Sequence, residues 1–252
     1  FALETIYAVP VFVMCLYPLI LSSFGTVSFK TSYTNIFGLL LYGTAFIAIG
    51  MFISSITESQ VISAILSIVV LLMGYMMQSL ENMISSNGNI LTKILGCFDL
   101  YTPVQDFLNG VISLSAVVYY ISITVLFLFL TCQSIQKIRW NVSKKTIGTG
   151  VFSMGFIAIV VAVNVFANEL PEKAKSVDLT SQNLYTLTDD SVNLVKDLKQ
   201  DVTLYVLSSE KSADDTVART LSNYEDASSH IKVEYIDPAV SPNFYASYTD
   251  TA

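Results

Sequence analysis

Charged side chains are scarce in this chain: Asp, Glu, Lys and Arg make up 13% of its 252 residues, about half the share of roughly 25% in soluble domains. Hydrophobic residues make up 53%, and the mean hydropathy is +0.59. This composition excludes a disordered chain and argues against a wholly soluble globule. We therefore expect lipid to be the solvent for much of the chain.

Cysteine and histidine are also rare. Cys15, Cys97 and Cys132 lie far apart and form no C-x-x-C pair, which excludes a zinc ribbon or a disulfide scaffold and favours buried free thiols. Any Ser-His-Asp or Cys-His mechanism would need His230, the single histidine, and no nucleophile motif surrounds it. We interpret His230 as a satisfied or solvated residue at a strand edge, and we expect no catalytic residue, metal site or cofactor in this chain.

The charges are unevenly distributed. Residues 1–169 carry six basic and six acidic residues, whereas residues 170–252 carry seven and fourteen, so the net charge of −7 belongs to the tail. The tail also has no glycine, which excludes a Gly-rich phosphate loop there. Because no basic stripe is present, we expect no nucleic-acid partner. The chain begins inside an apolar run without a methionine, and we expect it to be a fragment.

Long uncharged segments indicate membrane spans, because about 20 helical residues cross a bilayer core. The alternative, buried helices of a soluble core, would need polar surface that residues 1–168 do not supply. The sequence thus predicts an α-helical, multi-pass membrane protein. The five predicted spans are Thr5–Phe29, Thr31–Thr57, Ser59–Leu80, Val111–Gln136 and Thr146–Asn168.

Basic residues predict the orientation. Residues 137–145 carry Lys137, Arg139, Lys144 and Lys145, whereas other short loops carry at most one basic residue each. The positive-inside rule places this loop in the cytoplasm of a cell-membrane protein. Counting spans outward, residues 81–110 and the tail (169–252) are then extracytoplasmic.

Two connections carry further information. The short corner Thr57–Gln60 follows a Ser55-x-x-Glu58 pattern, which indicates a capping box opening the next helix or, as a plainer alternative, a well-capped turn. Residues 81–110 contain two short amphipathic runs, 90–98 and 100–108, broken by Asp99 and Pro103. Each run is too short to span, so we expect a re-entrant or interfacial helical pair.

The tail predicts an incomplete α/β domain. Thr188 is expected to cap a helix with Lys196 and Lys199 in its last turn, and a Ser212-x-x-Asp215 pattern to open a second helix over 213–228. Strands are expected at 202–207 and 231–236, which together with the second helix form a right-handed βαβ unit. Asp237 then stands at the carboxyl end of a parallel strand, either as a ligand-binding residue or as part of a turn-forming Asp-Pro pair.

Several motifs together resemble known families. Residues 49–60 (IGMFISSITESQ), followed by a long apolar span, are similar to the later half of type 2 ABC export permeases such as the gliding-motility permease GldF. The strings VDLT (177–180), LYTLT (184–188) and IKVEYIDP (231–238), with the strand 202–207, resemble the auxiliary domain GldG. The resemblance covers nearly the whole chain, with permease and auxiliary domain fused.

The resemblance implies the last four spans of a six-span permease (1–136), a fifth span (146–168) and an extracytoplasmic GldG-like domain. It implies a separate cytoplasmic ATPase near Thr57, Glu58, Ser59 and Gln60, and a second permease copy or half. Asp99, Pro103 and Asp106 would lie in the re-entrant segment, either lining the exit or solvated at the interface.

A competing hypothesis makes the spans an anchor. The tail would then be an extracytoplasmic binding or interaction module of the cell envelope, and the corner and re-entrant pair would have no transport role. These motifs identify neither a transported substrate nor a ligand of the tail. They indicate the direction of transport only by analogy with the families they resemble.

Overall fold

The computed structural model describes residues 2–84, 96, 98–139, 146–170, 175–180, 185–208 and 213–244. The chain divides into two compact units. We call residues 1–77 with 99–181 the helical unit, and residues 78–98 with 182–252 the tail unit.

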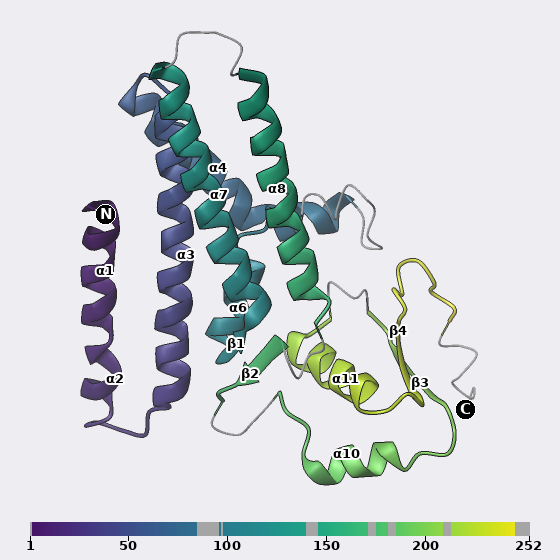
Figure 1. Ribbon diagram of the computed structural model, residues 1–252. Coiled ribbons are helices and arrows are strands. Elements are labelled where there is room, and N and C mark those ends of the chain that lie inside the picture. The colour runs from purple at the N-terminus through teal and green to yellow at the C-terminus, as the bar shows by residue number, and fades with distance from the viewer. Residues whose placement is uncertain are drawn as a thin grey trace. The chain divides into compact units, whose positions relative to one another are not determined.

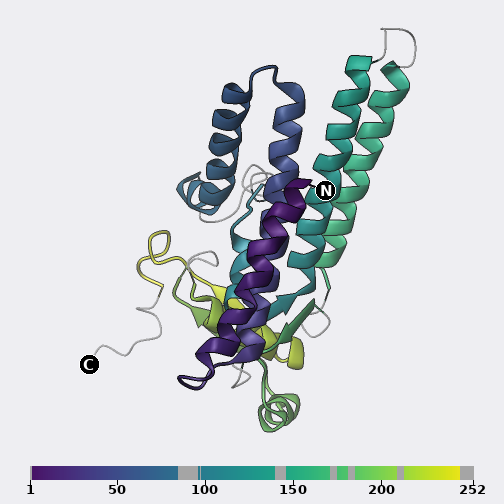
Figure 2. The ribbon, with the colours of Figure 1, turned by 90° about the vertical axis from the view of Figure 1, so that its left-hand side faces the viewer.

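Long helices build most of the helical unit (Figures 1 and 2). Two short strands, β1 and β2, complete it. Its elements are α1 (Ala2–Met14), α2 (Leu16–Leu21), α3 (Phe29–Ile56), α4 (Gln60–Ile84, which runs on into the tail unit), α6 (Thr102–Leu108), β1 (Val111–Ser113), α7 (Leu114–Arg139), α8 (Thr146–Asn168) and β2 (Ser176–Asp178).

Among the described residues, four helical segments are long and apolar enough to cross a membrane, which indicates a membrane-embedded protein of the multi-pass kind. They are Ala2–Leu21, Phe29–Ile56, Gln60–Leu80 and Leu114–Gln136. The fifth predicted span is a helix with the expected bounds, α8, but its apolar stretch over the described side chains, Ser153–Asn168, is shorter than those of the other four. Whether α8 crosses the membrane stays a prediction.

The first span differs from its predicted bounds, Thr5–Phe29. It begins before Thr5 and ends at Leu21, and Phe29 already belongs to α3. The span is interrupted at Cys15, because Pro18 has no N–H to donate to the carbonyl of Met14 and its ring crowds that carbonyl. The absence of charges did not locate the end of this span, because residues 22–28, which connect α2 to α3, are also uncharged.

The core of the helical unit lies where α3, α6 and α7 meet. Small residues allow the close approach: Ala45 and Ala116 are almost completely buried, and the position of Gly38 leaves room for Phe107. The buried Tyr120 donates from its hydroxyl to the carbonyl of Leu100, 2.7 Å away. This bond satisfies a backbone acceptor outside any helix, and it fixes the segment that leads into α6.

A small antiparallel sheet joins the start of α7 to the chain that follows α8. Ile112 pairs with Val177, and the N–H of Leu179 donates to the carbonyl of Gly110 at 3.1 Å. Gly110 has a φ of +82°, a conformation that glycine adopts without strain. Residues 111–113 were predicted as the first turn of a span and are instead strand β1, because β2 supplies backbone partners. The predicted tail domain (169–252) therefore contributes its first strand to the helical unit.

The tail unit contains a parallel βαβ arrangement. Its elements are α10 (Asp189–Lys196), β3 (Val202–Val206), α11 (Asp215–Ala227) and β4 (Ile231–Tyr235), with β3 and β4 parallel and in the register Val202↔Ile231. Val195, Ala227 and Ile231 form a small core. The predicted helix–strand–helix–strand order is thus confirmed over the described residues.

The helix caps of the tail unit agree with the prediction only in part. Thr188 accepts from the N–H of Ser191, as expected for the cap of α10, but Lys199 lies beyond the end of that helix. The cap of α11 is Asp214, whose carboxylate accepts from the N–H groups of Thr216 and Val217. The Ser212-x-x-Asp215 pattern therefore located this helix start two residues too early, because Asp214 is itself a strong capping residue.

Candidate functional site

The corner between α3 and α4, Thr57–Gln60, exposes polar side chains and is held by hydrogen bonds. Glu58 and Gln60 are exposed, whereas Thr57 and Ser59 are half-buried. The hydroxyl of Thr57 donates to the carbonyl of Ile53 at 2.9 Å, and the carbonyl of Ser59 accepts the first helical bond of α4 from the N–H of Ser63. The corner is therefore a short, internally bonded turn.

The predicted capping box is absent from this corner. The hydroxyl of Ser55 donates backward to the carbonyl of Phe52 at 2.7 Å, so Ser55 belongs to the last turn of α3 and does not cap α4. The carbonyl of Ser55 accepts from the hydroxyl of Ser134 on α7 at 3.1 Å. A contact between residues 79 apart in sequence thus ties the corner to α7, which spacing along the chain gave no means of predicting.

The basic residues lie at the same end of the helical unit as this corner. Lys137 and Arg139 form part of the last turn of α7, five residues or fewer from Ser134, and not of a loop as predicted. Figures 1 and 2 show the α3–α4 corner, the end of α7 and the start of α8 at one end, and the β1–β2 sheet at the other. Lys144 and Lys145 lie outside the described residues.

Asp99 is a buried helix-capping residue. It is only 8% exposed, and one of its oxygens accepts from the N–H groups of Tyr101 and Thr102 at 2.9 and 3.0 Å. The other accepts from the hydroxyl of Thr102. These bonds satisfy the free N–H groups at the start of α6. In this structure the carboxylate is therefore bonded to the start of α6 and little exposed, and its role at an exit stays a prediction.

The rest of the predicted re-entrant segment is partly visible. The second amphipathic run, 100–108, contains α6, and Pro103 stands in the first turn of that helix, where proline is tolerated, and does not break it. Asp106 is half-buried within α6. The first run lies outside the described residues except at positions 96 and 98, and the placement of either run in a membrane stays a prediction.

Asp237 occupies the expected position after β4 and serves as a turn residue. Its carboxylate accepts from the N–H of Ala239 at 2.8 Å, and its carbonyl accepts from Val240 and Ser241. This is the Asp-Pro turn that was the plainer alternative. A ligand at this end of the sheet stays untested.

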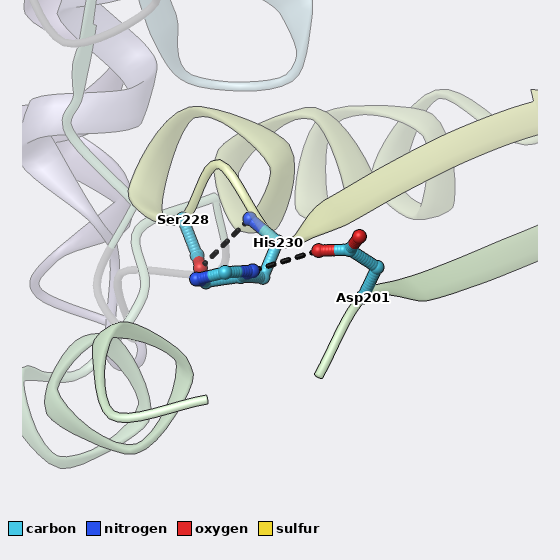
Figure 3. Close-up of polar contacts among 3 residues, drawn as sticks. All are labelled: Asp201, Ser228 and His230. Carbon is cyan, nitrogen blue, oxygen red and sulfur yellow. Dashed lines mark hydrogen bonds and ion pairs between the residues drawn. The ribbon is translucent and has the colours of Figure 1, made fainter. Parts of the chain in front are cut away.

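Ser228, His230 and Asp201 gather at the other end of the β3–β4 sheet (Figure 3). The ring Nδ1 of His230 lies 2.7 Å from Asp201. The hydroxyl oxygen of Ser228 accepts from the backbone N–H of His230 at 3.3 Å, whereas a serine nucleophile would donate its proton to the ring of a base. The carboxylate is 87% exposed. This arrangement lacks the nucleophile–base contact of a serine hydrolase, and it agrees with a satisfied histidine at a strand edge. Among the described residues no cluster of His, Cys, Asp or Glu could hold a metal ion.

Nearby, α11 holds the chain that leads into α10. The side-chain amide of Asn223 donates to the carbonyl of Tyr185 at 2.8 Å, and the guanidinium of Arg219 lies 5.6 Å from the centre of the Tyr185 ring. Burial lowers the pKa of Arg219. These contacts are structural, because they join two parts of the tail unit and leave the guanidinium largely covered.

The sequence did not predict the polar contacts that join α1 to α3. The hydroxyl of Thr44 lies 2.7 Å from Oε1 of Glu4 and 2.8 Å from the carbonyl of Leu40. Beside this contact, the hydroxyl of Tyr7 donates to the carbonyl of Leu39. An uncharged run places the start of the first span at Thr5 and so leaves Glu4 outside it. Its presence in an otherwise apolar helix is the signal that identifies it.

Comparison with known proteins adds one family. Residues 181–250 match a family described as a domain of unknown function (DUF7088). The match begins next to the start of the second segment of the tail unit, residues 182–252, and covers less than a third of the chain. No curated protein and no solved structure matches the chain.

Proposed function

We propose that this chain is a membrane-spanning permease subunit of an ATP-driven ABC exporter, fused to a GldG-like auxiliary domain. The observation that carries the proposal is the α3–α4 corner. It exposes Glu58 and Gln60 on a turn that Ser134 ties to α7. A docking point for a soluble ATPase needs exposed side chains on a turn that is bonded to the spanning helices. A movement of the ATPase can then displace those helices, whereas a loop without such bonds would move alone.

The arrangement of charges supports the orientation in this proposal. Lys137 and Arg139 share an end with the corner, and the positive-inside rule makes that end cytoplasmic. The ATPase would meet Thr57–Gln60 from that side, whereas residues 169–252 would lie outside the cell. The partners are then the cytoplasmic ATPase, a second permease copy or half, and the lipid bilayer of the cell membrane.

The proposed mechanism is alternating access. ATP hydrolysis on the separate subunit would move α3 and α4 through the corner, and the contact between Ser134 and Ser55 would pass that movement to α7. The chain itself would carry out no covalent chemistry and hold no cofactor.

The test uses the protein purified in mild detergent together with any ATP-hydrolysing subunit that accompanies it. Glu58→Lys reverses the charge at the corner and should reduce both the recovered ATPase and its activity at least several-fold. Glu169→Lys is the matched control, because Glu169 is equally exposed but follows α8, near the end that carries the β1–β2 sheet. Equal recovery of ATPase with both variants, or no ATPase with the unaltered protein, would reject the permease proposal.

A second candidate function follows from the tail. Residues 182–252 form the larger part of the tail unit, and the family match begins within one residue of position 182. These two observations favour a binding or interaction module held on a membrane anchor. In that case Glu58→Lys would leave function intact, and deletion of residues 182–252 would remove it.

A further inference from the structure

Three tyrosines lie together where α3, α4 and the start of α6 approach one another. The rings of Tyr75 and Tyr101 form a T-shaped pair with centroids 4.7 Å apart, and Tyr42 packs edge-on against Tyr120 at 6.0 Å. The phenol group of Tyr42 is also close enough to those of Tyr75 and Tyr101 to interact with them electrostatically. We call Tyr42, Tyr75 and Tyr101 the tyrosine cluster.

Two members of the cluster belong to helical segments that are apolar enough to span a membrane. Tyr42 stands about 20 Å along α3 from Phe29 and about 21 Å from Ile56, so it lies at the middle of that helix. Tyr75 stands about 22 Å along α4 from Gln60. Because Ile56 and Gln60 flank the corner, Tyr42 and Tyr75 occupy the same level of the two helices, as their proximity requires.

The three hydroxyl groups of the cluster make no hydrogen bond to any residue that the structure describes. Other tyrosines of the helical unit differ: Tyr7, Tyr33 and Tyr120 each donate to a backbone carbonyl of another segment. Tyr17 shares the lack of a bond, but it is 61% exposed on α2. Covered tyrosine hydroxyls ordinarily find a partner. The cluster therefore gathers three phenol groups whose donors and acceptors are unused.

Partners for these hydroxyl groups must come from outside the described protein groups. A hydroxyl without a partner is unfavourable in apolar surroundings. At the middle of α3, Tyr42 is also far from the helix ends, where the tyrosines of an aromatic belt meet the membrane surface. Tyr42 and Tyr101 are only half-buried and Tyr75 is 49% exposed, so a ligand can reach the cluster.

The backbone beside the cluster is fully engaged and holds the rings in place. The N–H of Leu100 donates to the carbonyl of Gly74 in α4 at 3.2 Å, and the carbonyl of Leu100 accepts from Tyr120 in α7. The oxygens of the neighbouring Asp99 are occupied by the cap of α6. The phenol groups are thus the part of this region that is available to a ligand, and their positions are fixed in advance.

The chemistry of the cluster selects a neutral ligand that is rich in hydroxyl groups. A phenol hydroxyl both donates and accepts, and ligand hydroxyls match it in both respects. An anion would need a basic partner, and Lys30, the basic residue of α3, lies about 18 Å along the helix from Tyr42. An organic cation would need open ring faces, but Tyr42 packs on Phe46 at 4.2 Å and Tyr75 packs on Tyr101.

We propose that the tyrosine cluster is a binding site for a hydroxyl-rich, neutral group of the sugar class. A soluble sugar and the headgroup of a glycolipid present the same chemistry, and both are sources of such a group. The ring surfaces beside the hydroxyls suit the apolar C–H surface of a sugar ring. The inference rests on the proposed function for the fate of the ligand, which would be part of the exported molecule, but not for binding itself.

The test is nuclear magnetic resonance of the protein in phosphatidylcholine nanodiscs, with tyrosine labelled by ¹³C at Cζ, an atom whose chemical shift responds to hydrogen bonding of the hydroxyl. Signals of the cluster are assigned by their loss in Tyr42→Phe, Tyr75→Phe and Tyr101→Phe. Glucose, or monoglucosyl diacylglycerol added to the nanodisc, should shift these signals in a saturable manner. The signal of Tyr17, an exposed tyrosine without a bond, should stay in place.

The two probes distinguish the sources of the ligand. A response to glucose identifies a soluble sugar, and a response to the glycolipid alone identifies a headgroup. No shift of the cluster with either probe, an equal shift at Tyr17, or the same shift with tetraethylammonium would overturn the proposal.

The hydroxyl groups themselves are tested by the triple variant Tyr42→Phe, Tyr75→Phe and Tyr101→Phe, which keeps the rings. It should weaken binding of the responding probe at least several-fold, measured by titration, whereas Tyr17→Phe should not. Unchanged binding by a triple variant with a normal thermal unfolding midpoint would overturn the site. If the triple variant unfolds, the three single variants carry the same comparison. A saturable shift without any recovered ATPase would reject the export function alone, and recovered ATPase without a shift would reject the tyrosine cluster alone.

Discussion

Gly38 sets the distance between α3 and α6. A Cβ at this position would lie 2.4 Å from Cβ of Phe107, an atom close to the backbone of α6 that no rotamer change can move away. Phe107 is fully buried, and its ring packs edge-on against Phe37. The close approach of these helices therefore depends on one missing methyl group.

Gly38→Ala should destabilise the protein by about 1–3 kcal/mol, the usual cost of overpacking a filled core. Gly50→Ala is the matched control on the same helix, because a Cβ there would meet nothing within 4 Å. It should be neutral or slightly stabilising, since alanine favours helix more than glycine does. The measurement is the thermal unfolding midpoint in detergent, and equal midpoints for the two variants would contradict the packing of α3 on α6.

Residue types alone predicted the roles of some residues correctly and those of others incorrectly. Thr188 caps a helix as expected, because the cap depends only on the next few residues. Ser55 and Asp99 have equally suggestive neighbours, yet Ser55 bonds backward within α3 and Asp99 is buried by α6. Their roles depend on the residue at which a helix begins or ends, and the packing of the helices determines that residue.

At the scale of elements, the least expected feature is the pairing of β1 with β2. It joins residues 111–113 to residues 176–178, across the whole α7–α8 hairpin. Phe129 and Phe156 stack between the two helices, and Ser153 donates to Gln133 at 2.6 Å, so the hairpin is also held along its length. The chain that follows α8 is thereby held beside the start of α7.

A disulfide can test this register. In a variant with the native cysteines replaced by serine, Ile112→Cys with Val177→Cys should crosslink on mild oxidation. Directly paired antiparallel residues have Cα atoms about 4.5–5.5 Å apart, within the range for a disulfide. Ile112→Cys with Asp178→Cys is the control, because a shift of one residue turns the second side chain to the other face. More crosslinking in the control pair would reject the observed register.

For the molecule as a whole, the orientation in the membrane is the property that links fold to function. The α3–α4 corner and the basic turn of α7 share one end of the helical unit, opposite the β1–β2 sheet. If the basic end is cytoplasmic, the chain after α8 emerges outside.

This orientation predicts opposite accessibility for two exposed positions, Glu58 in the corner and Ser241 after β4. In a cysteine-free background, Ser241→Cys should react with a membrane-impermeant maleimide on intact cells. Glu58→Cys should react only after the cells are permeabilised. The reverse pattern would invert the topology and remove the proposed docking point from the side where ATPases operate. Reaction of both positions on intact cells would place them on the same side of the membrane. That result would contradict the three crossings, by α4, α7 and α8, that this topology puts between them.

Composition and periodicity by themselves determined that this chain has long apolar helices suited to a membrane and a tail with a parallel βαβ arrangement. Both follow from local rules: an uncharged run must be shielded from water, and alternating apolar positions suit a strand. The tertiary structure decided what depends on distant partners. It turned residues 111–113 into a strand, tied Ser134 to the corner, buried Asp99, and brought Glu4 against Thr44. These contacts join residues that the sequence separates, so only the packing of the helices creates them.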